Sequence, residues 1–452
     1  MLISLWLEGR DRERRPALDR DVGVDVAVIG AGIVGLTTAL LLEREGMNVA
    51  VLEMRHVGAG ATGYTTAKLS SLHGLTYRQL AKSIGREKAH TYGEANEAGI
   101  ARVFELAADL EIDCDLRRKP NYTYAEDAAD LDKVREEAEL AGGLGLPATY
   151  VEELDLPYPV AGAVRFDDQA EFHPVKYLDG LAGALRGPLY EDTLATGVGP
   201  GRVSTARGPR VSAEHVVVAT HLSFLDRGLY FARCHPERSY VVAGRDGDLP
   251  SAMYLSTESP AHSIRAHGDW LLVGGESHKT GQADAAERFA RLSAWARERF
   301  GLDPELRWAT QDQMPVDGVP YVGRHDPVSR NLWVATGFKK WGLAMGSAAA
   351  ELLAAQIAGR EHRWAGLFDP NRIRPRAGAP TFAKENANVA YHFFADRVRN
   401  HGAPRCTHLG CLLDWNDAER TWDCPCHGSR FAESGEVIEG PAVERLNLPD
   451  RT

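Results

Sequence analysis

The stretch DVAVIGAGIVGLTTALLLEREGMNVAVLE, residues 25–53, decides the fold of the first part of the chain. Residues 25–29 are a short apolar run followed by glycine, which predicts a buried parallel strand. The apolar residues from position 33 to 42 predict a helix packed on a sheet, and residues 47–52 predict a second strand. A strand, a helix and a second strand in this order indicate a Rossmann-like α/β domain.

Three glycines between the first strand and the helix form a G-x-G-x-x-G motif. Gly30 suits the tight turn, Gly32 lets a pyrophosphate approach the backbone, and Gly35 lets the helix lie close to the strand. The helix N-terminus offers free N–H groups and a partial positive charge to the phosphates. Glu53 follows the second strand and can accept hydrogen bonds from an adenosine ribose. The motif therefore predicts a dinucleotide site, and it fits NAD and FAD alike.

The segment after this acid, RHVGAGATGYTTAKLS at residues 55–70, resembles the D-amino-acid oxidase superfamily of flavoenzymes, which includes glycine oxidase and sarcosine oxidase. In that family an ATG-type segment passes the pyrophosphate and the flavin. Three further stretches resemble the family in order and spacing: HVVVAT (215–220), VDGVPYVGR (316–324) and TGFKKWGLAMG (336–346). The resemblance covers about residues 20–370 and implies FAD as the cofactor.

The resemblance also implies how FAD is held. Tyr64 occupies the region where family members with covalent flavin carry a histidine, so we expect noncovalent FAD. Lys340 occupies the position of an Arg in glycine oxidase and is expected to place a positive charge at the pyrimidine edge of the flavin. The alternative is that Lys339 and Lys340 are simply solvated. The residues expected to contact FAD are Gly30, Ala31, Gly32, Ile33, Val34, Gly35, Glu53, Met54, Arg55, Ala61, Thr62, Thr65, Thr66, Ala67, Thr220, Gly337, Lys340, Trp341 and Gly342.

The sequence suggests a direct organic reductant, because no second G-x-G-x-x-G follows a predicted strand. By the resemblance, Asp312 stands where glycine oxidase relatives carry the Arg that clamps the substrate carboxylate. A carboxylate can instead hold an ammonium group, so we predict a substrate recognised through an amine. The alternative is that Asp312 pairs with a nearby Arg or Lys and contacts no substrate.

Three more residues are candidates for the substrate or flavin face. Lys68 lies in the flavin-side segment, where it would promote oxygen chemistry or pair with a phosphate. Tyr240 and Trp341 are candidate walls of a desolvated pocket, which would favour the neutral amine that gives hydride to a flavin. The alternative is that both are core aromatic residues.

The family resemblance predicts a discontinuous FAD-binding domain, residues 20–100, 160–235 and 318–370, and a mixed or antiparallel-sheet substrate domain, residues 101–159 and 236–317. Residues 371–400 are predicted to form a linker, rich in Pro and Arg up to Pro380, and then a connecting helix. Residues 401–452 are predicted to form a small β-rich domain.

The last part of the chain concentrates soft ligands in CTHLGC (406–411) and CPCHGS (424–429). The spacing Cys406-x-His408 and Cys424-x-x-His427 is that of a Rieske [2Fe-2S] centre, in which two thiolates hold one iron and two imidazoles hold the other. Tetrahedral zinc is the rival interpretation, but zinc sites favour C-x2-C or H-x3-H pairs over C-x-H.

This segment resembles Rieske proteins of the cytochrome bc type, which implies further roles. Cys411 and Cys426 would form a disulfide, and Ser429 would donate a hydrogen bond to a cluster sulfur. Phe431 replaces a Tyr of that group, and the lost hydrogen bond would lower the cluster potential. Residues 440–442 match the proline loop that covers the cluster. A Rieske domain normally begins with several strands, which residues 401–405 cannot supply. We therefore expect a shortened segment, either because this member has lost part of the domain or because a stretch is absent from the sequence as given.

Composition narrows the remaining possibilities. Apolar content of 44% and charged content of 25% are those of a globular protein, and a formal net charge of -11 argues against nucleic-acid binding. No run of 18 apolar residues predicts a membrane span, and the apolar N-terminal stretch is too short for a signal peptide, so we expect a cytoplasmic protein. Cys114 and Cys234 stand apart and are expected to be buried thiols.

Taken together, the chain resembles a group of bacterial FAD-dependent oxidoreductases with a C-terminal Rieske domain. We predict oxidation of a C–N bond in a small amine or amino acid, with electrons passed from FAD to the [2Fe-2S] cluster and then to an external acceptor. One alternative is an oxygen-reducing amine or amino-acid oxidase with a degenerate structural tail. Another is a non-catalytic electron-transfer or scaffold protein.

Overall fold

The first sheet of the computed structural model, which describes residues 2–245, 247–399 and 402–448, contains the glycine motif. Its strands lie in the order β10-β11-β12-β1-β2-β9, with β19 beside β12 and β18 beside β19. Strand β1 pairs in parallel with β2 and β12, and β12 pairs in parallel with β19, as expected of a Rossmann-like fold. The bounds are β1 (Val22–Ile29), β2 (Val49–Leu52), β9 (Leu189–Tyr190), β10 (Ala195–Gly199), β11 (Arg202–Thr205), β12 (Arg210–Val218), β18 (Tyr321–Arg324) and β19 (Leu332–Thr336).

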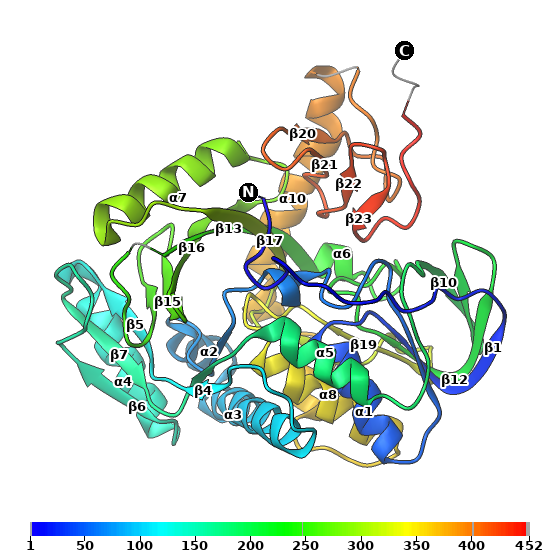
Figure 1. Cartoon of the computed structure of the whole chain (residues 1–452), viewed down its shortest axis with the longest axis horizontal. Helices are drawn as coiled ribbons and strands as arrows, with labels where there is room; N and C mark the ends of the chain where they lie inside the picture. The colour runs from blue at the N-terminus through cyan, green and yellow to red at the C-terminus, as the bar shows by residue number, and fades with distance from the viewer. Residues whose placement is uncertain (1, 246, 400–401, 449–452) are drawn as a thin grey trace.

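Helices α1 (Ile33–Arg44), α3 (Arg86–Asp109), α5 (Pro174–Ala184) and α8 (Ala344–Ile357) gather on one side of this sheet (Figure 1). Helix α1 packs against α5 and α8, and α8 packs against α3. Because α8 lies between other elements, nearly all of its residues are buried, which its alanine-rich sequence permits. The glycine motif at the start of α1 is therefore held by a rigid layer on one side and the parallel strands on the other.

The second sheet has the strand order β17-β13-β16-β15-β14-β5-β7-β6. The sheet is mixed. Strands β14 and β5 pair in parallel, and the other neighbouring strands in this order pair antiparallel. Strand β7 belongs to this sheet, although its residues fall in the range expected for the FAD-binding domain. The bounds are β5 (Asn121–Ala125), β6 (Ala148–Val151), β7 (Gly162–Phe166), β13 (Cys234–Gly244), β14 (Met253–Ser256), β15 (Ser263–His267), β16 (Trp270–Lys279) and β17 (Leu306–Pro315).

Short elements complete the body. Helix α7 (Ala285–Phe300) packs on β13 and β16, and α4 (Leu131–Gly143) packs on β6 and β7. Cys114 and Cys234 are buried free thiols, as the sequence predicts. The remaining elements are β3 (Lys68–Leu69), β4 (Arg117–Arg118), β8 (Ala170–Glu171), α2 (Thr76–Ile84), α6 (Tyr230–Arg233), α9 (Ala365–Phe368) and the 3₁₀ helices Ala61–Tyr64 and Ala128–Asp130.

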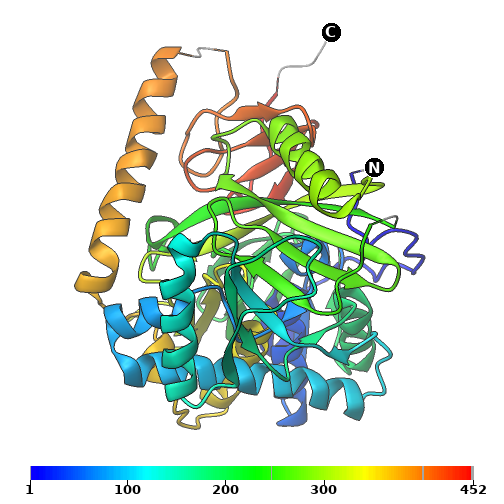
Figure 2. The ribbon, with the colours of Figure 1, turned by 90° about the vertical axis from the view of Figure 1, so that its left-hand side faces the viewer.

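A long helix, α10 (Pro375–Arg399), joins the body to the C-terminal module, which we define as residues 402–448 (Figure 2). The linker predicted up to Pro380 is therefore shorter than expected, because the helix already begins at Pro375. A proline at a first helical position gives up an N–H that would have no partner there anyway, and Pro380 follows within the helix without ending it. The Pro- and Arg-rich composition therefore predicted the start of the helix too far along the chain.

The C-terminal module is a small antiparallel sheet, β20 (Asp414–Asn416), β21 (Thr421–Asp423), β22 (Arg430–Ala432) and β23 (Val437–Glu439). In the described residues from 402 to 405, the pairing with later backbone is a single bridge from Arg405 to Leu412. The module has its own apolar core, and Val389 and Phe393 of α10 pack against that core. Residues 401 and 449–452 of the predicted segment lie outside the described residues.

None of the helices in the described ranges is long and apolar enough to cross a membrane.

Candidate functional site

A cavity of about 600 Å³ lies where the two sheets and the C-terminal module meet. The glycine motif and residues 58–62 and 64–66 line one part of it, and β13, β16 and β17 line another. The C-terminal module contributes Glu419, Thr421, Arg430 and residues 438–440, 442 and 443 to its wall. The cavity is therefore built by three regions that are far apart in the sequence.

The glycine motif has the geometry of a dinucleotide cradle. A Cβ atom at position 35 would lie 1.9 Å from the backbone oxygen of Gly30, so only glycine allows α1 to approach β1 this closely. Gly32, Ile33 and Val34 line the cavity, and Gly32 caps α1 without a side-chain bond. The start of α1 can therefore donate its N–H groups to a pyrophosphate, which is the fit that FAD requires.

Glu53 follows β2 and its side chain lines the same part of the cavity. Its carboxylate accepts hydrogen bonds of 2.9 Å from the backbone N–H groups of Ala31 and Arg55. Burial raises the pKa of Glu53 above its ordinary value, and these two hydrogen bonds oppose the shift. The acid is thus fixed beside the motif, where it can accept a hydrogen bond from a ribose hydroxyl.

Most of the residues predicted to contact FAD line this cavity, and three do not. Gly35 lies beneath the motif against Gly30, and Gly337 has a φ of +78° and packs under Pro315 and Cys234. Ala67 is fully buried, and its carbonyl accepts a hydrogen bond of 2.7 Å from Arg265. The predicted residues that line the cavity are Gly30, Ala31, Gly32, Ile33, Val34, Glu53, Met54, Arg55, Ala61, Thr62, Thr65, Thr66, Thr220, Lys340, Trp341 and Gly342.

Lys340 lines the cavity, but its charge is already paired. Its Nζ lies 2.8 Å from Glu237 and 2.7 Å from the hydroxyl of Ser277. Lys339 and Lys340 both adopt left-handed backbone, with φ of +52° and +71°, a costly conformation for residues with side chains. Such a conformation persists only where the surrounding structure holds it, and it is concentrated at functional sites.

Asp312 of β17 lies at the centre of a second set of contacts. Its Oδ2 accepts a hydrogen bond of 2.7 Å from the backbone N–H of Lys340, and its Oδ1 lies 3.2 Å from Nε2 of His221. Oδ1 also accepts the N–H of Gln313 at 2.7 Å. Asp312 is therefore paired with a protein side chain, and that partner is a histidine rather than an Arg or Lys. Because Asp312 also lines the cavity, this pairing does not remove it from the cavity wall.

Lys68, Tyr240 and Trp341 all line the cavity. Lys68 donates to the carbonyl of Tyr254, and burial, aided by the charge of Arg265, holds its pKa well below the ordinary value. The hydroxyl of Tyr240 lies 2.8 Å from Nε2 of His278. The ring of Trp341 stacks on His73 with centroids 4.5 Å apart. Each of the three side chains is thus held by a contact with another residue of the body, and each contributes to the cavity wall.

The four residues predicted to bind the cluster lie together in the C-terminal module. A hydrogen bond between the two thiols lowers the pKa of Cys406 to about 7 and raises that of Cys424. The rings of His408 and His427 have centroids 5.2 Å apart. Their Nδ1 atoms are both buried and have no hydrogen-bond partner among the described residues. Two paired thiols and two unpartnered imidazole nitrogens fit the donor set of a Rieske [2Fe-2S] cluster.

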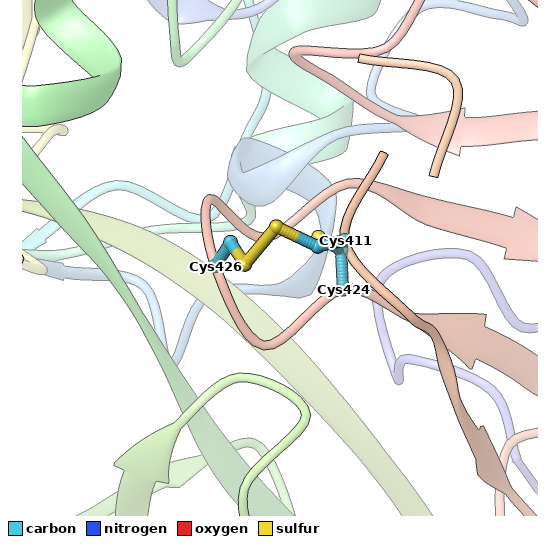
Figure 3. Close-up of side chains that lie close together, drawn as sticks. All are labelled: Cys411, Cys424 and Cys426. Atoms are coloured by element: carbon cyan, nitrogen blue, oxygen red, sulfur yellow. A yellow bond between two sulfur atoms is a disulfide. The ribbon is translucent and has the colours of Figure 1, made fainter. Parts of the chain in front are cut away.

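Cys411 and Cys426 form a disulfide that joins the two cluster loops, residues 406–411 and 424–429. Cys424 lies beside this disulfide, so three sulfur-bearing residues gather within one small volume (Figure 3). Disulfide sulfurs are not thiolate ligands, so the free thiols of this module that are available as ligands are those of Cys406 and Cys424. The hydroxyl of Ser429 bonds to the Cys406 thiol and accepts the N–H of Ala442 at 3.0 Å, which ties residues 440–442 to the cluster loops.

The second cluster loop is docked on the edge of the second sheet. Gln311 of β17 donates to the carbonyl of Gly428 at 2.9 Å, and Thr280 donates to Gln311 at 2.6 Å. Gln282 donates to the carbonyl of Pro425 at 3.1 Å. Where a longer Rieske domain would use strands of its own, the body and α10 support the loops here.

The segment of residues 220–231 contacts both sites, and the sequence predicted a site role only for its first residue, Thr220. Thr220, His221 and Leu222 line the cavity. Nε2 of His408 lies 2.9 Å from Asp226, and the ring of Phe231 makes edge contacts with both His408 and His427. The residues after Thr220 carry no motif, and their partners lie up to 218 positions away, so no local signal could have identified them.

Fold and site together define an FAD-dependent oxidoreductase with an attached Rieske [2Fe-2S] domain. The family model described as DAO, FAD dependent oxidoreductase, matches residues 25–356, and that described as Rieske [2Fe-2S] domain matches residues 401–449. The chain therefore belongs to the DAO family of FAD dependent oxidoreductases and ends in a Rieske domain.

Similar proteins agree with this assignment. The Rieske 2Fe-2S iron-sulfur protein YhfW of Bacillus subtilis (strain 168) is 33% identical over 495 residues, covering 99% of this chain and 97% of the relative. The cytochrome b6-f complex iron-sulfur subunit of Nostoc punctiforme is 40% identical over 89 residues, 20% of this chain and 45% of that subunit. Glycine oxidase from Geobacillus kaustophilus superposes with a TM-score of 0.65 at 20% identity, covering 78% of this chain and 99% of that structure, a similarity of fold.

Proposed function

We propose that this protein oxidises a C–N bond of a small amine or amino acid and delivers the electrons through its Rieske domain to an external acceptor. The observation that carries the proposal is the segment of residues 220–231, which lines the cavity at one end and contacts the cluster histidines at the other. A two-electron oxidation site and a one-electron carrier are thereby joined by twelve consecutive residues of the body.

FAD, when bound, accepts two electrons from a substrate as hydride, and a [2Fe-2S] cluster carries them away one at a time. The chain's own contribution is binding and orientation. Tyr240 and Trp341 give the cavity aromatic walls, and a dry wall favours the neutral amine that the oxidation needs.

Asp312 is our candidate for recognising the amine. A carboxylate has about four lone-pair sites, and three of those on Asp312 are used by His221, Gln313 and the backbone of Lys340. One site on Oδ2 is left for an ammonium group before it loses its proton. Lys68, with its lowered pKa, is our candidate for holding a proton at the cavity wall, where its Nζ donates to the carbonyl of Tyr254 on β14.

The test is an anaerobic panel of amines and amino acids mixed with the enzyme loaded with FAD and iron. We expect at least one class to bleach the flavin absorbance and then to produce the EPR signal of the reduced cluster. Peroxide formation in air distinguishes this dehydrogenase from an oxygen-reducing oxidase, because an oxidase would release about one peroxide for each substrate. If no compound of the panel bleached the flavin, the proposed substrate class would be wrong.

A further inference from the structure

His221 is bonded on both sides by carboxylates from different parts of the chain. Its Nε2 lies 3.2 Å from Oδ1 of Asp312 on β17, and its Nδ1 lies 3.2 Å from Oε1 of Glu439 on β23. Asp312 belongs to the second sheet, and Glu439 belongs to the C-terminal module. We call these three residues the His221 bridge, since one imidazole links the cavity wall to the Rieske domain.

The backbone holds His221 in a demanding position. Its φ is +69°, a left-handed conformation that residues with side chains adopt at a cost. Its carbonyl accepts a hydrogen bond from the hydroxyl of Thr336, at the end of β19. The first sheet therefore aims the imidazole into the gap between the other two regions, and the conformational cost is offset by the contacts made there.

The electrostatic surroundings favour the charged form of the imidazole. Burial alone would lower the pKa of His221, but the hydrogen bonds and charges of Asp312 and Glu439 raise it to about 10. The other charged groups near the bridge are already paired: Lys340 with Glu237, Arg238 with Glu419, and Arg430 with Asp423. Arg430 also lies 3.9 Å from Glu439.

The bridge stands where the C-terminal module covers the cavity. His221, Asp312 and Glu439 all line it, and Gly440, Ala442 and Val443 follow directly after Glu439 in the same wall. Ala442 is bonded to Ser429 of the second cluster loop. A movement of Glu439 away from His221 would thus both open the cavity and shift a loop that packs on the cluster ligands.

We propose that His221 is a positioning residue: as a cation held between Asp312 and Glu439, it fastens the C-terminal module over the cavity in the arrangement that electron transfer requires. The part of this inference that concerns electron transfer rests on the proposed function, and the part that concerns docking of the module does not.

The first measurement is hydrogen exchange of the holoenzyme, which needs no substrate. We expect His221→Gln to raise the exchange rate of the backbone from Val437 to Val443 by about tenfold or more, because it removes the cation between the partly buried carboxylates of Asp312 and Glu439. His221→Lys, which restores a cation, should recover part of the protection. Glu439→Gln should reproduce the effect, and the double variant should be no worse than either single one.

A matched control is His215→Gln, since His215 lies on β12 six residues earlier and does not line the cavity. Its exchange from Val437 to Val443 should stay at the level of the unaltered protein. If His221→Gln gave the same exchange as His215→Gln, the docking role of His221 would be overturned.

The second measurement follows electrons after light-driven reduction of the bound flavin by a sacrificial donor. We expect His221→Gln to slow the appearance of the reduced-cluster EPR signal by about tenfold or more and His221→Lys to restore part of the rate. If no electron reached the cluster in the unaltered protein, the proposed function would be contradicted. The docking role of His221 would then be decided by the hydrogen-exchange measurement alone. A rate in His221→Gln within about twofold of the unaltered protein would overturn the electron-transfer part.

The pH profile separates this role from a merely structural one. Since the pKa of His221 is raised from 6.5 to about 10, its contribution to docking is fully present below 6.5 and is lost as the pH rises through about 10. Exchange of the segment from Val437 to Val443, corrected for the intrinsic pH dependence of exchange, should therefore rise across this range. His221→Gln should lack that additional dependence, and an identical profile in both proteins would contradict the proposal.

Discussion

At the scale of single residues, the glycine motif and the cluster ligands are the parts that chemistry constrains most. Both are local in sequence, and both were predictable because dinucleotide cradles and Rieske centres demand particular residues at fixed spacing. His221 and Glu439 also line the cavity, and Asp226 contacts His408. They were not predictable, because a histidine or a carboxylate has no signature until the fold brings its partner near.

Gly35→Ala is expected to impair FAD binding. The added Cβ would lie 1.9 Å from the carbonyl oxygen of Gly30, so α1 would have to move away from β1 and carry the pyrophosphate cradle with it. Overpacking of this kind costs about 1 to 3 kcal/mol. Flavin absorbance per protein and the unfolding temperature of the purified variant measure both effects. Gly183→Ala in α5 is the control, since nothing lies within 4 Å of that position, and equal flavin content in the two variants would contradict the expectation.

Phe431→Tyr is expected to raise the reduction potential of the cluster. Phe431 is fully buried in the core of the C-terminal module, which also contains Cys406 and Cys424, and we expect an added hydroxyl to donate a hydrogen bond to the cluster or its thiolate ligands. One hydrogen bond of about 1 kcal/mol to a reduced cluster corresponds to on the order of 40 mV for one electron. An EPR-monitored redox titration measures the shift. Phe393→Tyr on α10 adds the same hydroxyl at the edge of this core and should leave the potential unchanged.

At the scale of elements, α10 and the segment before it determine where the C-terminal module stands. Lys279 at the end of β16 lies 2.5 Å from Glu385 and donates to Asn388 at 2.6 Å, which ties the middle of α10 to the second sheet. Asn386 donates to the carbonyl of Ala232 at 3.0 Å. A helix with charged and amide anchors of this kind acts as a fixed strut between the two sites.

Asp317 and Arg372 anchor the segment that leads into α10, and they make stability depend on pH. Both side chains are buried, and Arg372 donates to the carboxylate at 2.7 and 2.8 Å. Burial raises the pKa of Asp317, but the guanidinium outweighs it and lowers the pKa below 3.8. The stabilisation is therefore present above about pH 4 and is lost as the pH falls through the lowered pKa.

Asp317→Asn is expected to lower the free energy of unfolding by about 3 to 5 kcal/mol at neutral pH, because it leaves a buried guanidinium unpaired. The difference from the unaltered protein should shrink toward pH 3, because the carboxyl of Asp317 gains protons as the pH falls and its ion pair with Arg372 is lost. Urea unfolding at the two pH values gives the comparison. Asp303→Asn breaks an exposed pair with Arg297 and should cost less than about 1 kcal/mol at either pH.

The elements themselves differ in how far sequence could predict them. The unit β1–α1–β2 follows from hydrophobic pattern and glycine spacing over fewer than forty residues, and its prediction is confirmed by the parallel pairing of β1 with β2. The placement of β7 in the second sheet depends on pairing with β5 and β6, and the early start of α10 depends on packing against the body. Both are tertiary effects that override local composition.

At the scale of the whole molecule, the body supplies what the short Rieske segment lacks. Residues 402–405 contribute a single bridge to later backbone, yet the cluster loops are supported by Gln311, Gln282 and α10. The Rieske domain and the flavoprotein body therefore share one structural unit around the cluster. It follows that iron loading should respond to changes in the body that touch no ligand.

Gly428→Ala tests this dependence. Gly428 has a φ of +78°, and an added Cβ would lie 2.6 Å from Cβ of Pro236 and 2.8 Å from Nε2 of Gln311, both on the second sheet. The second cluster loop would have to move off the sheet, which we expect to cost about 1 to 3 kcal/mol beyond the left-handed backbone penalty. Iron and sulfide per flavin, together with the EPR amplitude of the reduced cluster, should fall while flavin content stays normal.

The control must carry the same backbone penalty without the contact. Gly208→Ala provides it, because Gly208 has a φ of +104° and nothing lies within 4 Å of its added Cβ. If both variants kept full iron content, the cluster loops would hold their shape without the sheet, and the body would serve only as a neighbour. If Gly428→Ala alone lost iron, the cluster site would extend across the contact into β13 and β17, because Pro236 and Gln311 are not among the predicted iron ligands.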